Sequence, residues 1–139
     1  LWRAVDHEGE VLESYVTKRR NKRAALNFLR KALKRHGRVD KIVTDRLASY
    51  RAALREAGCV SKQETGRWLN NRAENSHLPF RRRERAMQRF RRMRSLQKFA
   101  SVHSSVFNHF NQERTLSRRD IFKTNRSAAL EEWRGLLAA

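Results

Sequence analysis

The order of local patterns in the first sixty residues constrains the fold more than any other feature of this sequence. Two extended runs, 1–5 and 10–17, flank the turn-forming spacer 6–9, and this arrangement predicts a β-hairpin. Apolar residues recur at helical spacing over 22–36, and the β-branched run 39–44 follows at once. The order strand, strand, helix, strand predicts an α/β domain whose third strand is central and parallel to a neighbour.

Helices are expected on both sides of the middle of the chain. Apolar residues at helical spacing predict a helix over 47–57. Asn70 or Asn71 can cap a later helix that contains Glu74. Pro79 follows five residues after Glu74, so we expect it to kink or restart that helix.

The C-terminal third is expected to be mostly helical. Ser95 is expected to cap a long helix that reaches Asn111, and 114–125 is expected to be a loop. A last helix is expected over 127–137. No repeat or low-complexity linker interrupts the sequence, so 1–139 is interpreted as one domain.

The charge of the chain predicts a polyanionic partner. Its 33 Lys and Arg residues exceed its 14 Asp and Glu residues, for a net charge of +19. Self-repulsion of that size opposes compaction, so nucleic acid is the expected partner. No apolar stretch approaches spanning length, and no membrane partner is expected. Cys59 is the only cysteine, which excludes an internal disulfide and a cysteine-based zinc site and fits the reducing cytoplasm.

Two acids occupy positions that suit metal chemistry. Asp45 ends the expected strand 39–44, at the sheet edge where open α/β sheets bind ligands, and Glu74 lies at the start of the expected helix. Two-metal phosphoryl transfer needs carboxylates from separate elements, and magnesium prefers oxygen ligands. Acids at element ends are more often caps or turn residues, so their positions alone do not assign them this role. Asp6 is interpreted as a turn residue.

A dense basic segment follows the second acid and suits a phosphate backbone. Such contacts give affinity and salt dependence without sequence readout, although a charged, solvated surface is the simpler alternative. His77 shares a helical face with Glu74 and is expected to contact substrate or orient an acid rather than to bind metal, with a plain structural role as the alternative. The candidate DNA-binding residues are His77, Arg81, Arg82, Arg83, Arg85 and Arg89.

These motifs together resemble the DDE transposases of bacterial insertion sequences, and most closely the sixth insertion-sequence family. The resemblance covers essentially the whole chain and is carried by Ile42-Val43-Thr44-Asp45-Arg46-Leu47, Asn70-Asn71-Arg72-Ala73-Glu74-Asn75-Ser76-His77, and Arg81-Arg82-Arg83-Glu84-Arg85 with Met87 and Phe90. It implies an α/β, RNase H-like mixed sheet flanked by helices, with a helical C-terminal part. It also implies DNA transposition, in which transposon ends are nicked and joined to target DNA.

The resemblance assigns roles to the two acids. It makes Asp45 the second and Glu74 the third member of an Asp-Asp-Glu triad that holds two Mg²⁺ or Mn²⁺ ions. The first Asp of the family lies on a strand upstream of the Trp2-Arg3-Ala4-Val5-Asp6 hairpin strand. The chain is therefore interpreted as a partial catalytic domain without that strand and without an N-terminal helix-turn-helix, and as inactive alone.

Partners and the alternative function follow from the same interpretation. We expect DNA as the partner, a homo-oligomer for the intact protein, and a bacterial, cytoplasmic protein that associates with the nucleoid when bound to DNA. The alternative is a non-catalytic basic module that binds DNA or RNA, because two acids are present where the family has three.

Overall fold

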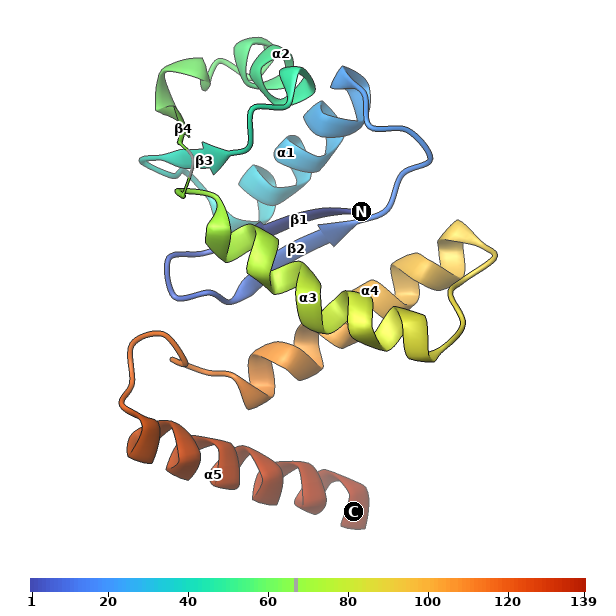
Figure 1. Cartoon of the computed structure of the whole chain (residues 1–139), viewed down its shortest axis with the longest axis vertical. Coiled ribbons are helices and arrows are strands. Elements are labelled where there is room, and N and C mark those ends of the chain that lie inside the picture. The colour runs from blue at the N-terminus through green and yellow to red at the C-terminus, as the bar shows by residue number, and fades with distance from the viewer. Residues whose placement is uncertain (67) are drawn as a thin grey trace.

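A computed structural model describes residues 1–66 and 68–139 of the chain. Figure 1 shows the hairpin in the middle, with α1 and α2 on one side and α3 and α4 on the other. In chain order, the elements are β1 (Trp2–Val5), β2 (Val11–Tyr15), α1 (Lys22–His36), β3 (Ile42–Thr44), α2 (Ala48–Glu56), the 3₁₀ turn η1 (Val60–Lys62), β4 (Gln63–Thr65), α3 (Asn71–Ala86), α4 (Met93–Phe110) and α5 (Arg119–Ala138).

The indole of Trp2 joins the hairpin to the two helices that cover it. The side chain is only 1% exposed. Its ring stacks on Phe28 of α1, with 6.1 Å between the centroids, and meets Tyr50 of α2 edge-on at 5.3 Å. Its Nε1 donates a hydrogen bond to Thr17 Oγ1 at 2.8 Å. The predicted hairpin is confirmed, and its inner face is the centre of the apolar core.

Helix α1 has the bounds that the periodicity predicts, because both of its ends are capped. The Asn21 side chain accepts a hydrogen bond from Ala24 N at 3.0 Å. Gly37 ends the helix with φ +81°, a backbone conformation that glycine adopts without strain. Its buried face also packs against α2 through Ala53 and Leu54, which are fully buried.

Helix α4 closes the outer edge of β2 with two side-chain amides. Asn108 accepts from Val11 N and donates to Val11 O, both at 2.9 Å. Gln97 accepts from Val16 N and donates to Ser14 O, both at 2.8 Å. The two amides therefore satisfy backbone groups that a further strand would otherwise pair with.

The strands form two separate two-stranded sheets within the described part of the chain. β1 pairs with β2 in antiparallel fashion, and β3 pairs with β4 in parallel fashion. The predicted parallel pairing of β3 is confirmed, but its predicted central place in one mixed sheet is wrong. A cavity separates β1 from β3, so their backbone groups cannot meet at strand spacing.

Three predicted helix boundaries differ from the structure. Helix α3 does not restart at Pro79 but runs through it, and Phe80, 1% exposed, anchors this part of the helix in the interior. Helix α4 begins at Met93, two residues before Ser95. The expected loop 114–125 ends early because α5 begins at Arg119, with Asp120 in its first turn, where the helix dipole favours an acid.

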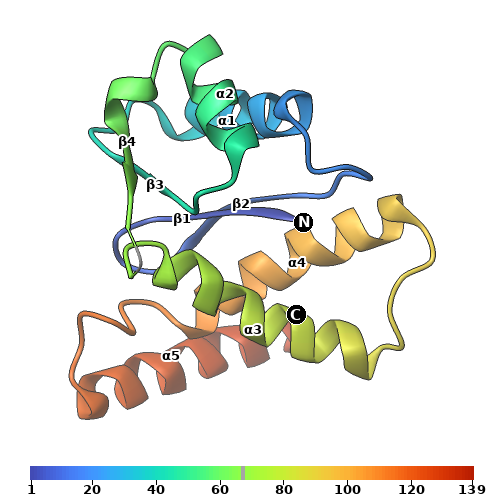
Figure 2. The ribbon, with the colours of Figure 1, turned by 45° about the horizontal axis from the view of Figure 1, so that its top comes forward.

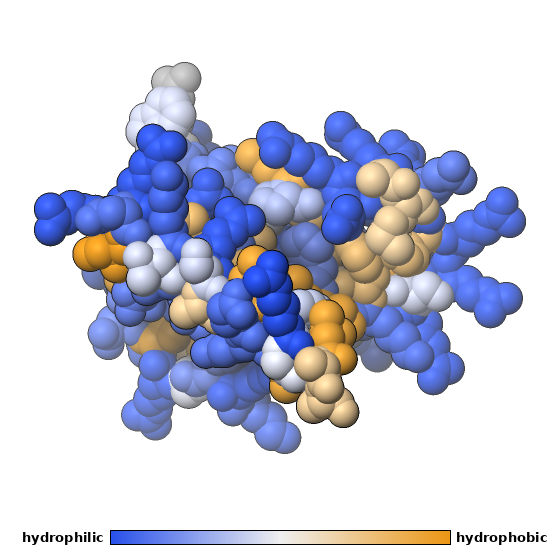
Figure 3. All heavy atoms as spheres, turned by 90° about the horizontal axis from the view of Figure 1, so that it is seen from below, coloured by the Kyte–Doolittle hydropathy of each residue, from blue (hydrophilic) through white to orange (hydrophobic). Residues whose placement is uncertain are grey.

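Helix α5 packs on α4 on the side away from the hairpin (Figures 1 and 2). Its Trp133 contacts Phe110 of α4, with 5.8 Å between the ring centroids, whereas Leu136 and Leu137 are 73% and 75% exposed. Figure 3 shows a surface that is mostly hydrophilic, with apolar side chains in small groups. Among the described residues, no helix is both long and apolar enough to span a membrane.

Removal of the Asn108 amide tests the closed edge of β2. Asn108→Ala leaves the N–H and C=O of Val11 without partners, so we expect the free energy of unfolding to fall by about 1–3 kcal/mol. Urea denaturation followed by circular dichroism measures the change. Gln112→Ala, at an exposed position just after α4, is the control. Equal stability of both variants would show that the amide does not hold this edge.

Candidate metal and nucleic-acid site

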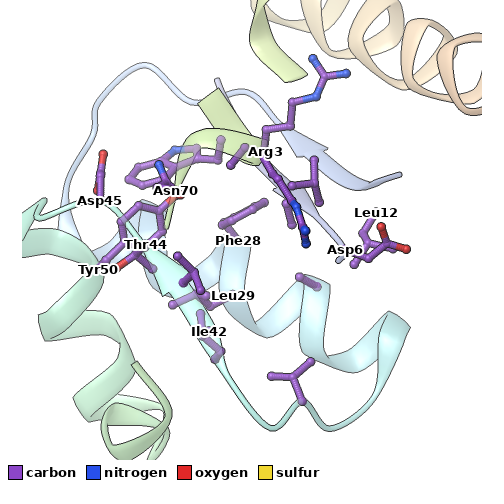
Figure 4. A pocket seen from close by; sticks show the side chains of 18 of the residues that line it. Arg3, Asp6, Leu12, Phe28, Leu29, Ile42, Thr44, Asp45, Tyr50 and Asn70 are labelled. Carbon is purple, nitrogen blue, oxygen red and sulfur yellow. The ribbon is translucent and has the colours of Figure 1, made fainter. Parts of the chain in front are cut away.

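A cavity of about 940 Å³ lies between the hairpin, β3 and the first turns of α3. Residues 1–5 of the β1 segment line one side, and residues 42–45 of the β3 segment line the other. Figure 4 shows Ile42, Thr44 and Asp45 along the β3 side of the cavity, with Phe28 and Leu29 of α1 between the strands. The cavity therefore lies between the two sheets, along the edges of β1 and β3 that pair with no other strand among the described residues.

Asp45 lies at the end of the cavity where β3 gives way to α2. Its Oδ1 accepts a hydrogen bond from Leu47 N at 3.1 Å, which fixes the carboxylate before the helix begins. The pKa of Tyr50 is raised to about 12, first by burial and then by the negative charge of Asp45. Tyr50 is therefore protonated at neutral pH. In Figure 4, Asp45, Tyr50 and Asn70 lie at the same end of the cavity.

Glu74 reaches the same cavity from the first turn of α3. Asn70 is the N-cap, as the sequence predicts, but its side chain does not bond a backbone amide. Asn70 Nδ2 instead donates to Glu74 Oε1 at 3.4 Å. Both Glu74 and Asp45 line the cavity. Glu74 is exposed, and Asp45 is half-buried. The two predicted site acids thus come from separate elements and border one space.

Asp6 also lines the cavity, but its carboxylate is engaged elsewhere. Its Oδ1 accepts hydrogen bonds from Glu8 N and Glu10 N, both at 2.9 Å. This confirms Asp6 as a turn residue. No group of three or more His, Cys, Asp or Glu side chains arranged to hold a metal ion occurs within residues 1–66 and 68–139. Asp45 and Glu74 are hard oxygen donors, the type of ligand that Mg²⁺ prefers.

His77 lies in the cavity on α3, one turn after Glu74. It is half-buried, and its Nδ1 is buried without a hydrogen bond in the described structure. The pKa of His77 is lowered to about 4. Burial is the largest cause, and the positive charges of Arg3 and Arg81 contribute further. The imidazole is therefore neutral at pH 7, whereas the arginines that follow it are positively charged.

The predicted DNA-binding arginines face solvent along α3 and the loop to α4. Arg81 has the one ion pair that the structure records for these residues within its described ranges, at 3.9 Å to Glu84 Oε2. Gln88 and Arg89 in the loop have φ values of 58° and 66°, so the chain turns sharply between the two helices. Arg81, Arg82, Arg83, Arg85, Arg89, Arg91, Arg92, Arg94 and Lys98 are all exposed.

Arg3 is a buried cation that no pattern in the sequence assigns to the site. It is 5% exposed, and the Cζ of its guanidinium lies 5.5 Å from the centroid of the Phe80 ring. Burial lowers the pKa of Arg3 to about 10. Strand alternation gives a signal for its direction, because Trp2 and Ala4 pack on the α1 side and Arg3 must face the other way. Its burial depends on α3 and α4, which no local pattern places there.

Fold and site together define a small basic α/β domain with two carboxylates at one cavity and an arginine-rich surface beside it. The DDE domain family of IS240-type transposases matches residues 1–113. The chain therefore belongs to this family, which confirms the resemblance to insertion-sequence DDE transposases.

Similar proteins occur in Staphylococcus aureus. The transposase for the insertion sequence-like element IS431mec, strain Mu50, is 30% identical over 82 residues. The transposase for insertion sequence element IS257 in transposon Tn4003 has the same identity over the same length. Each match covers 55% of this chain and 37% of the relative. No solved structure matches the chain significantly.

The lowered pKa of His77 predicts a specific acid sensitivity. The folded state resists protonation until about pH 4, whereas an unfolded histidine binds a proton near pH 6.5. Stability should therefore fall as the pH decreases through this window. His77→Gln should remove part of this loss, on the order of 1 kcal/mol after allowance for partial solvent screening.

Urea denaturation of both proteins at pH 7 and pH 4 measures the difference. His7→Gln, at an exposed histidine in the hairpin turn, is the control. An identical pH dependence in wild type and His77→Gln would contradict the lowered pKa.

Proposed function

We propose that this chain is part of the catalytic domain of a DNA transposase, in which Asp45 and Glu74 are two of the three acids that hold divalent metal ions. The observation that carries the proposal is that both acids, from separate elements, border one cavity beside a solvent-exposed run of arginines. Membership of the DDE domain family supports it. The substrate is DNA: the ends of a transposable element and the target into which they are joined.

The residues of the cavity have separate roles in this proposal. Asp45 and Glu74 are the metal ligands, and bound Mg²⁺ or Mn²⁺ supplies the Lewis acid for phosphoryl transfer. The Asn70 amide orients the Glu74 carboxylate through its hydrogen bond. His77, neutral at pH 7, can form a hydrogen bond to substrate or to an acid without adding positive charge. The exposed arginines hold the phosphate backbone in register.

The third acid is proposed to come from a strand between β1 and β3. Both strands border the cavity, and neither has a second strand partner within the described residues. A strand in this space would join the hairpin and the β3–β4 pair into one mixed sheet, which is the RNase H-like arrangement. Residues 1–139 would then be part of a larger catalytic domain that acts as a homo-oligomer on paired DNA ends.

A second function is supported by the arginine surface alone. A non-catalytic basic module would bind DNA or RNA through the same exposed side chains and would not need Asp45 or Glu74. It differs from the first proposal in its metal requirement, so substitution of the acids distinguishes the two.

Substitution of either acid should abolish metal-dependent cleavage. In the full-length gene product, Asp45→Asn and Glu74→Gln should each reduce Mg²⁺- or Mn²⁺-dependent nicking of transposon-end DNA by at least a hundredfold, with DNA binding and circular dichroism unchanged. Asp40→Asn, an acid outside β3 that also lines the cavity, is the matched control. Normal nicking by both acid variants would refute the site, and binding without any nicking by the wild type would favour the non-catalytic module.

Neutralisation of arginines should weaken binding in a salt-dependent manner. The triple variant Arg81→Gln, Arg82→Gln, Arg83→Gln should bind duplex DNA more weakly at every sequence, and each lost contact should reduce the slope of log K against log salt by about 0.9. Fluorescence anisotropy at several salt concentrations measures this. Arg118→Gln, Arg119→Gln, Arg126→Gln on the α5 side removes the same charge from exposed positions. Equal losses in both triple variants would show that net charge, rather than this surface, binds DNA.

A further inference from the structure

The guanidinium of Arg3 is buried without a compensating group. Its Nε, Nη1 and Nη2 atoms are all inaccessible to solvent and have no hydrogen-bond partner in the described structure. Nor does any carboxylate among the described residues lie within ion-pair distance of it. Phe80 beneath the guanidinium offers a weak attraction, but no acceptor for its N–H groups. A buried charge of this kind costs several kcal/mol unless it is paired.

The same hairpin contains a second buried charge, and this one has ion-pair partners. Glu13 is 6% exposed, on β2 opposite Ala4. Its carboxylate lies 3.3 Å from Lys31 Nζ and 3.5 Å from Arg35 Nη1, both on α1. The contrast shows that this fold pairs the buried ion on the α1 side of the hairpin. Of these two buried charges, only Arg3, on the α3 side of the hairpin, has no ion-pair partner among the described residues.

The edge of β1 next to Arg3 is the open edge of the hairpin. Asn108 and Gln97 close the β2 edge, but within residues 1–66 and 68–139 no hydrogen bond closes the other edge of β1. That edge borders the 940 Å³ cavity, which Arg3 also lines. A strand paired there would alternate its side chains, and those on the α3 side would lie about 5 Å from Arg3 at the directly opposite position.

We propose that Arg3 is a buried binding site for a carboxylate, carried by an acidic side chain of an extended segment that pairs with the open edge of β1. A carboxylate matches the fork of a guanidinium with two parallel hydrogen bonds, and the ion pair neutralises the buried charge. A DNA phosphate does not fit, because the guanidinium packs against Phe80 of α3 in the interior, out of reach of a duplex backbone. The proposal deepens the proposed function, since the segment occupies the space assigned there to a third strand, and makes Arg3 a positioning residue for that strand.

Acetate, a small carboxylate, tests whether the Arg3 guanidinium binds a carboxylate group. The ¹⁵N-labelled 139-residue chain is titrated with sodium acetate against sodium chloride at constant ionic strength, at pH 7, with EDTA present to exclude metal effects. The Nε–H resonance of a buried arginine reports directly on the group. We expect this resonance to shift with saturation in acetate and not in chloride.

Two variants make the acetate titration decisive. Arg3→Met keeps an unbranched apolar side chain without the guanidinium and should bind acetate at least tenfold more weakly, as judged from shifts of the β1 amides. Arg72→Met, at another exposed arginine that lines the same cavity, should bind as the wild type does. If Arg3→Met does not fold, Arg3→Lys keeps the charge without the fork and should also bind more weakly. Equal acetate affinity in wild type and Arg3 variants, or no shift of the Nε–H resonance, would overturn the proposal.

A short peptide tests the extended segment. Acetyl-Thr-Val-Glu-Val-Thr-amide is compared with the same peptide in which Gln replaces Glu, and both are compared with acetate at equal concentration. We expect the Glu peptide to shift the Arg3 Nε–H resonance and the amides of β1 and β3 at a concentration at least tenfold lower than acetate needs. If the Glu peptide shifts these resonances at no lower concentration than acetate or the Gln peptide does, the proposal of an extended segment at this edge is wrong. This readout uses neither metal nor DNA, so its failure is distinct from failure of the nicking experiment.

Discussion

The burial of Trp2 is the contact on which the remaining structure depends. A single indole fills the space between β1, α1 and α2, and its Nε1–H is satisfied by Thr17 at the end of the hairpin. An aromatic side chain of this size contributes more apolar area than any other residue of the core. It fixes which face of the hairpin is interior. The opposite face, which carries Arg3 and Ser14, is thereby directed toward α3 and α4.

The cavity and its acids follow from that orientation. With the hairpin held against α1, β3 lies beyond the open edge of β1, and Asp45 follows at the end of β3. Helix α3 brings Glu74 and His77 to the same space, with its exposed arginines at the rim or outside. The neutral, desolvated histidine and the solvated arginines, only a few residues apart on one helix, show how strongly depth decides the electrostatic character of a side chain.

Local patterns in the sequence predicted those parts of the fold that local interactions determine. The hairpin, α1 and strand β3 were predictable because alternation, helical spacing and a glycine cap act within a few residues. Pro79 misled the prediction because its local effect was outweighed by the burial of Phe80 next to it. The separation of the two sheets was also unpredictable, since strand order depends on long-range pairing that no short pattern encodes.

The candidate site was predictable to a similar degree. Asp45 and Glu74 were identifiable from their places at element ends and from the family resemblance, and the structure brings both to one cavity. Arg3 was not, because its sequence neighbours indicate only that it points away from Trp2. Whether that direction leads to solvent or to the interior depends on helices about seventy to one hundred residues further along the chain.

The amides of Asn108 and Gln97 have a consequence for self-association. While α4 is in place, a strand from another molecule can pair with β2 only by breaking four hydrogen bonds, so the hairpin offers a single pairing edge. Two such hairpins can pair through their open β1 edges, and the pair then has no open edge left for a further strand. Detachment of α4 would free the second edge and convert the same hairpin into a unit that adds strands on both sides, which is the condition for open-ended polymerisation.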